Sequence, residues 1–101
     1  MRWVVVWPDG DREECYSPSL VITDYFHEGQ TYPIEDFMER GRTALTIASE
    51  RVRAKYGFPC SRALNQLARL EAVVERFSAD PDASVTCNTF MFDDQEPSRS
   101  R

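Results

Sequence analysis

The stretch PIEDFMERGRTALTIASERVRAKYGFP, Pro33 to Pro59, decides the fold. Proline fits the first position of a helix, and the two acidic residues after Ile34 suit the positive end of the helix dipole. Apolar residues then recur at helical spacing, opposite a charged face. These are Ile34, Phe37, Met38, Gly41, Ala44, Leu45, Ala48 and Val52. The pattern predicts one helix over Pro33–Tyr56, about 36 Å long at 1.5 Å per residue.

The next helix follows after a short break. Gly57 suits a left-handed C-terminal cap and Pro59 prevents continuation, so a second long helix is predicted over about Ser61–Phe77. Its apolar side is Ala63, Leu64, Leu67, Ala68, Leu70, Val73, Val74 and Phe77. Two amphipathic helices joined by so short a turn form an antiparallel hairpin.

The N-terminal residues predict a β-hairpin. Arg2–Trp7 is β-branched and aromatic, Pro8–Gly10 supplies a turn, and Asp11–Tyr16 returns. With Gly10 in the left-handed conformation, the last residue of the first strand faces the first of the second. One side of the hairpin then carries Trp3, Val5, Trp7, Glu13 and Cys15, and the other carries Val4, Val6, Arg12, Glu14 and Tyr16. The first strand is apolar on both faces.

Three further segments complete the prediction. Ser19–Phe26 is expected to form a short helix, His27–Pro33 a connector, and Ala83–Phe92 a strand beside the hairpin. In that strand Val85, Cys87, Thr89 and Met91 are expected to face one way, and Thr86, Asn88, Phe90 and Phe92 the other. The expected fold is a two-layer α+β domain over residues 1–92, in the order β-β-α-α-α-β, with a disordered tail over 93–101.

Composition narrows the class of function. The formal charge of −5 disfavours nucleic acid, and no apolar run approaches the length of a membrane span, which favours a cytoplasmic protein. The three cysteines include no C-x-x-C pair, so reduced thiols are expected. Zinc bound by Cys15, Cys60, Cys87 and His27 is an alternative, but structural sites usually supply their ligands as close pairs. We therefore predict neither a metal nor a cofactor.

Cys60 and His27 are weak catalytic candidates. Cys60 precedes a helix, whose N-terminal dipole lowers a thiol pKa, and Arg62 adds positive charge. A nucleophilic thiol needs a base, and the only histidine lies in another loop. The alternative, which we favour, is that Cys60 is a small boundary residue packed under Phe58.

Partner binding has better candidates. Exposed apolar patches mark interfaces, so the face with Trp3, Val5 and Trp7 could receive a second copy or another protein, unless the chain covers it. The helical turn offers Tyr56, Phe58 and Arg62 as further contacts. Its basic residues Arg51, Arg53, Lys55 and Arg62 are either an anion site or, more commonly, a solvated face.

Several segments resemble a known family. They are MRWVVVWPDG, CYSPS, YFHEGQTYPIEDFMERGRTAL and ASERVRAKYGFPCSRALNQL, and together they extend over roughly residues 1–77. They are similar to the small bacterial nitrogen-starvation-response family, encoded beside a nitrilase, a radical-SAM protein, an acetyltransferase and a flavoprotein. The resemblance implies a role in assimilating nitrogen from nitriles or cyanide, and it carries over no catalytic residue.

Two functions follow as hypotheses. The first is a non-catalytic accessory or regulatory protein that binds an enzyme of that cluster, or a second copy of itself. The second is a small thiol enzyme or carrier that uses Cys60. A short chain with one histidine and no complete catalytic set favours the first.

Overall fold

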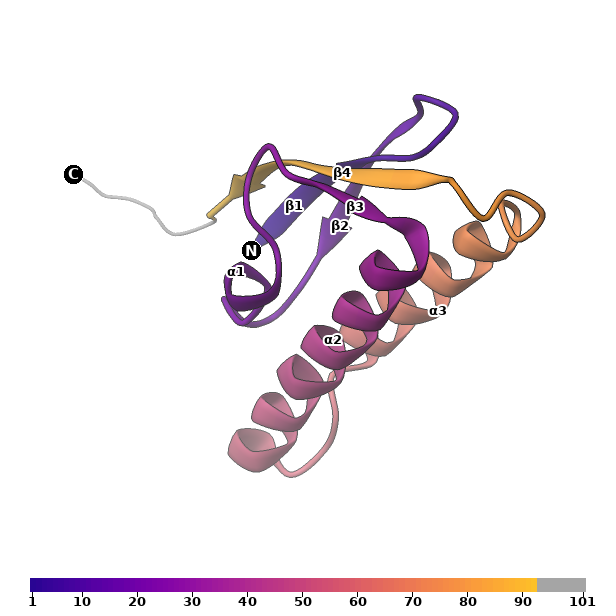
Figure 1. The fold of residues 1–101 in the computed structure, drawn as a ribbon. Coiled ribbons are helices and arrows are strands. Elements are labelled where there is room, and N and C mark those ends of the chain that lie inside the picture. The colour runs from indigo at the N-terminus through magenta and orange to yellow at the C-terminus, as the bar shows by residue number, and fades with distance from the viewer. Residues whose placement is uncertain (93–101) are drawn as a thin grey trace.

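The computed structural model describes residues 1–92, and the predicted disordered tail lies outside them. Two layers are visible in Figure 1: a four-stranded antiparallel sheet, and a helical hairpin packed against one face of it. The strands are β1 (Arg2–Val6), β2 (Arg12–Tyr16), β3 (Thr31–Pro33) and β4 (Ser84–Met91), in the spatial order β2-β1-β4-β3. The helices are α1 (Ile22–Tyr25), α2 (Ile34–Tyr56) and α3 (Ser61–Glu75). The predicted α+β class is confirmed.

The hairpin forms as its sequence predicts. Gly10 has φ +92°, its N–H donates to the Trp7 carbonyl at 2.8 Å, and the Trp7 N–H donates to the Asp11 carbonyl at 2.8 Å. The register pairs Trp3 with Cys15 and Val6 with Arg12. The three-residue loop therefore fixes which side chains share a face.

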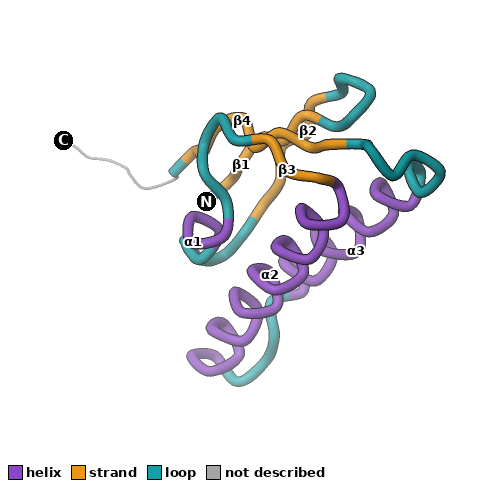
Figure 2. Tube along the Cα trace, viewed as in Figure 1, coloured by secondary structure: helices purple, strands orange, loops and turns teal. Residues whose placement is uncertain are grey.

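The helical hairpin also follows its sequence. Gly57 ends α2 with φ +90°, and its N–H donates to the Arg53 carbonyl at 2.8 Å. At Gly41 an added Cβ would lie 3.4 Å from Leu70 Cδ1, about van der Waals contact, so this position of α2 lies directly against α3. Figure 2 shows the two helices running side by side, with their connecting loop at the end away from the sheet. The hairpin therefore projects beyond the layer that it covers.

Four elements differ from the prediction. The short helix is only α1, because residues before Ile22 form turns. α3 ends at Glu75 and not near Phe77. The connector contains the extra strand β3, in which Tyr32 pairs with Val85. A bulge between Val4 and Val5 in the β1–β4 pairing reverses the faces of β4 beyond it.

The bulge corrects the predicted faces of β4. Cys87 pairs with Val5 and Phe90 with Trp3, so both lie on the buried face, whereas Thr89 pairs with Val4 on the opposite face. Strict alternation had predicted that Thr89 shares a face with Cys87 and that Phe90 lies on the opposite face. One extra residue in β4 is enough to reverse every later side chain.

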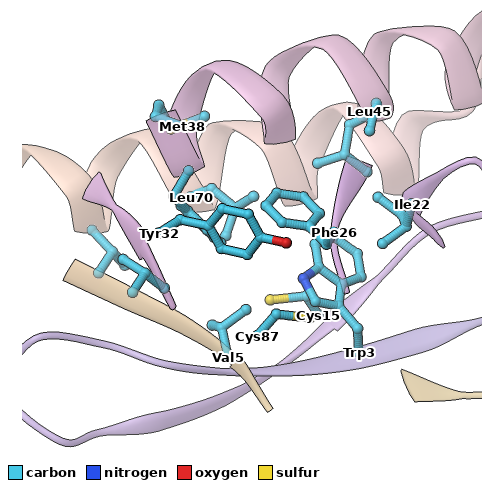
Figure 3. Close-up of a cluster of buried hydrophobic side chains, with 14 of the residues drawn as sticks. Trp3, Val5, Cys15, Ile22, Phe26, Tyr32, Met38, Leu45, Leu70 and Cys87 are labelled. Carbon is cyan, nitrogen blue, oxygen red and sulfur yellow. The ribbon is translucent and has the colours of Figure 1, made fainter. Parts of the chain in front are cut away.

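The core lies between the sheet and the helices and is rich in aromatic rings (Figure 3). The Phe26 ring centroid lies 5.3 Å from those of Tyr32 and Phe37, and 6.4 Å from that of Trp3. Trp7 meets Phe37 edge-on at 5.5 Å. Burial of rings in such offset and edge-on pairs contributes to stability beyond the apolar area removed from water.

Candidate functional site

The apolar face predicted to receive a partner is the core face of the sheet. Trp3 and Val5 are fully buried and Trp7 is 4% exposed within a single chain. Helices α2 and α3 cover this face, so these three side chains cannot present a binding surface in this structure. The prediction that they bind a partner is therefore corrected. β1 is apolar on its other face because it is a central strand, where Val4 and Val6 are half-buried between neighbouring strands.

The weak catalytic candidates lie in different parts of the molecule. Cys60 is half-buried at the N-cap of α3, in the turn that joins α2 to α3. His27 is exposed in the loop after α1, where its backbone N–H donates to the Tyr32 hydroxyl at 2.8 Å. That loop runs up to the sheet, whereas the α2–α3 turn lies at the opposite end of the helical hairpin (Figure 1). The structure therefore gives Cys60 no histidine as a base.

The other two thiols lie inside the core. Burial raises the pKa of Cys15 and, with the charge of Glu28 as a smaller cause, raises the pKa of Cys87 to about 11. Both are therefore protonated at neutral pH and enclosed. Within residues 1–92 no group of three or more His, Cys, Asp or Glu side chains could hold a metal ion.

The end of the helical hairpin is exposed, apolar and basic. We call this region the helical tip, and it comprises residues 51–62 together with the adjoining segment 18–20. Phe58 is 66% exposed and Tyr56 60%. Leu20 in the segment 18–20 and Leu64 in the first turns of α3 are also exposed. Residues 51–62 hold four of the 12 basic residues of the chain and none of its 17 acidic ones.

Local geometry explains why Phe58 points outward. The left-handed Gly57 ends α2, and after Pro59 the chain enters α3 at Ser61. Phe58 therefore sits at the apex of a tight reversal, away from the core. Cys60 itself is half-buried and packs against the core, as expected of a small residue at a helix boundary, whereas Phe58 is 66% exposed.

A cleft of about 290 Å³, here called the basic cleft, is part of the helical tip. Its lining residues are Pro18, Ser19, Arg51, Val52, Lys55 and Tyr56. The Arg51 Nη1 donates to the Ser19 hydroxyl at 2.8 Å, and the Lys55 ammonium lies 5.4 Å from the Tyr56 ring centroid. Within residues 1–92 neither Arg51 nor Lys55 has an ion-pair partner and no carboxylate lines the cleft, whereas the neighbouring Arg53 Nε lies 3.8 Å from a Glu50 carboxylate oxygen.

The Arg62 side chain packs on an aromatic ring of the chain itself. Its guanidinium lies 3.8 Å from the Tyr16 ring centroid, so it links the start of α3 to the end of β2. Tyr56, Phe58 and Arg62 are all accessible, and their role in partner binding stays a prediction. Sequence reasoning missed Pro18 and Ser19, because nothing in the sequence places them beside the end of α2.

A second cleft, about 390 Å³, lies between the β1–β2 hairpin and α3, and we call it the hairpin cleft. Glu13 is 19% exposed there; its carboxylate accepts from the Trp7 indole N–H at 3.0 Å and from the Arg69 Nε at 2.9 Å. The bond and charge of Glu13 raise the pKa of the Arg69 guanidinium. The Arg76 Nη2 lies 3.7 Å from the Asp9 Oδ2 in a second ion pair. The full lining is Trp7, Asp9, Asp11, Arg12, Glu13, Arg69, Val73, Arg76 and Phe77.

Fold and site together describe a small α+β protein with an internally paired polar cleft and an exposed aromatic and basic end. A family model described as nitrogen starvation-induced protein NitG matches residues 2–90. The chain therefore belongs to the NitG family, and the nitrogen-starvation context expected from its sequence is confirmed. No curated protein and no solved structure matches it. Within the described residues, no helix is long and apolar enough to span a membrane.

Proposed function

We propose that this protein is a non-catalytic accessory or regulatory protein of the nitrogen-starvation response, and that it acts by binding a partner protein through the helical tip. The supporting observation is the exposure of Tyr56 and Phe58 near Arg51 and Lys55, two cations that have no ion-pair partner within residues 1–92. Interfaces are enriched in aromatic residues and arginine, and such side chains commonly carry most of the binding free energy. The partner that we propose to test first is an enzyme of nitrile assimilation.

Self-association through this region is disfavoured. Two copies that met tip to tip would bring two sets of four basic residues together, and like charges in contact oppose binding. The helical tip is locally basic although the chain as a whole is acidic, so a protein with acidic groups around an apolar surface complements this region.

The experiment is affinity purification of the tagged full chain from nitrogen-starved cells, in parallel with two variants. We expect one partner to co-purify with the wild type and to be lost with the double variant Tyr56→Ala/Phe58→Ala. Phe92→Ala is the matched control, because Phe92 is 55% exposed on another part of the molecule. Equal recovery of the partner with the double variant, or no partner with the wild type, would contradict the proposal.

A further inference from the structure

We propose that the basic cleft binds a carboxylate side chain in an acidic peptide segment of the partner. This inference rests on the proposed function and specifies its chemistry. Arg51 and Lys55 are four residues apart on α2, so their side chains are neighbours on one face of the helix. Together they offer one anion two cationic donors.

The positive charge in this cleft is not neutralised from within. The Ser19 hydroxyl accepts from Arg51 at 2.8 Å and so orients the guanidinium, but it is neutral and leaves the charge available. A guanidinium has five N–H donors, and this bond uses one of them. An incoming carboxylate therefore meets an oriented donor without first displacing an internal anion.

The apolar surroundings favour an anion attached to a peptide over a free ion. Val52 and Tyr56 line the cleft beside the two cations, and Leu20 and Phe58 are exposed in the same part of the molecule. Phosphate or a free carboxylate would leave these side chains in water. A peptide with acidic and apolar residues buries both kinds of surface, which is the composition of a protein interface.

The charge distribution favours a peptide over an anionic membrane. The positive charge is local to the helical tip, because residues 51–62 hold four basic residues and no acidic one whereas the chain as a whole has a net charge of −5. A charged bilayer is an extended plane that also repels acidic parts of the chain within about one Debye length, roughly 8 Å at physiological salt. A peptide segment contacts the helical tip alone, and the same argument disfavours nucleic acid.

The test is a titration of the ¹⁵N-labelled full chain, followed by NMR, with a decapeptide of alternating Glu and Asp that has one central Leu. The matched peptide replaces each acid by its amide. We expect the acidic peptide to shift the amides of Ser19, Leu20 and residues 51–56, and the amide peptide to shift none of them. Arg51→Gln and Lys55→Gln should each weaken binding about tenfold, the loss of one charge-assisted hydrogen bond. Arg76→Gln, in the hairpin cleft, is the matched control and should change nothing.

Several outcomes would overturn the inference. They are equal binding of the amide peptide, shifts centred on the hairpin cleft, or saturation of the basic cleft by inorganic phosphate at the peptide's concentration. If the protein binds vesicles of mixed neutral and anionic phospholipid in a manner that depends on Arg51 and Lys55, and does not bind the peptide, the cleft is a membrane-binding site and the inference fails. If Arg51→Gln/Lys55→Gln leaves partner capture intact while Tyr56→Ala/Phe58→Ala abolishes it, the inference fails and the proposed function stands. If the peptide binds as expected but no partner is captured, the proposed function fails instead.

Discussion

The hairpin cleft and the basic cleft differ in how their charges are used. In the larger hairpin cleft three guanidiniums lie among three carboxylates, and Glu13 is already bonded to both Trp7 and Arg69. In the smaller basic cleft, no carboxylate of residues 1–92 is among the residues that line the cleft with the two cations. A ligand would have to compete with internal ion pairs in the first, but only with water and the neutral Ser19 and Tyr56 side chains in the second. Cleft size is therefore a poorer guide to function here than unused charge.

The strongest test of this contrast is truncation of the tryptophan under the hairpin cleft. Trp7 is 4% exposed and packs on Phe37, so Trp7→Ala should lower the free energy of unfolding by about 3–5 kcal/mol. Trp7→Phe keeps a ring there and should cost clearly less. Urea denaturation followed by circular dichroism measures both. A loss below about 1 kcal/mol for the alanine variant would mean that this cleft does not depend on core packing.

The ion pair in the hairpin cleft should contribute less. Glu13→Ala leaves the buried Trp7 indole N–H without its acceptor, and we expect it to lower the free energy of unfolding by about 1–3 kcal/mol. Asp11→Ala is the control, since Asp11 lines the same cleft with no side-chain hydrogen bond within residues 1–92; its effect should stay within about 0.5 kcal/mol. Similar losses for the two variants would show that Glu13 has no special role.

A third carboxylate, outside both clefts, sharpens the distinction between structural and available charge. Glu28 accepts from the Phe90 N–H and the Thr89 hydroxyl, both at 2.8 Å. The Phe90 bond first, and the Thr89 bond second, lower the pKa of Glu28. The stabilisation is therefore present above the ordinary glutamate pKa and is lost as the pH falls through the lowered value.

The variant Glu28→Gln removes this charge. It should be less stable than the wild type at neutral pH, and the difference should shrink as the solution is acidified below the ordinary glutamate pKa. Denaturation at a series of pH values measures this. A difference that does not depend on pH would indicate that the charge of Glu28 does not matter.

The smallest effect on stability is expected at the helical tip. Tyr56 and Phe58 keep most of their surface in water, so Tyr56→Ala and Phe58→Ala should each change the free energy of unfolding by no more than about 0.5 kcal/mol. Thermal denaturation of the single variants checks this. A loss comparable to that of Trp7→Ala would place these rings in the core and remove the physical basis for a docking role.

Local patterns predicted much of the framework. The hairpin register followed from a three-residue loop with Gly10, and the helical hairpin from apolar periodicity and Gly57. β3 was missed because a strand of three residues has no pattern of its own and forms only where β4 offers it a partner. The bulge in β4 was missed because strict alternation is the default pattern of a strand.

The candidate site was predicted in part. Tyr56, Phe58 and the basic residues around them were evident, because a tight turn between two long helices exposes what it contains. Trp3, Val5 and Trp7 were assigned to a partner surface although they belong to the core, because both faces of β1 are apolar and periodicity alone does not say which face the helices cover. Ser19 could not be predicted as part of the site, because it contacts Arg51, which is 32 residues away in the chain.

The sequence by itself determined the elements whose causes are local: the hairpin loop, the positions of the two long helices and the break between them, and the basic, aromatic composition of that turn. The tertiary structure alone decided which face of the sheet is buried, where the short third strand pairs, and which cations have no ion-pair partner within residues 1–92. The physical reason is that burial and charge pairing depend on groups brought together from distant parts of the chain, whereas turns and helix ends depend on a few neighbouring residues.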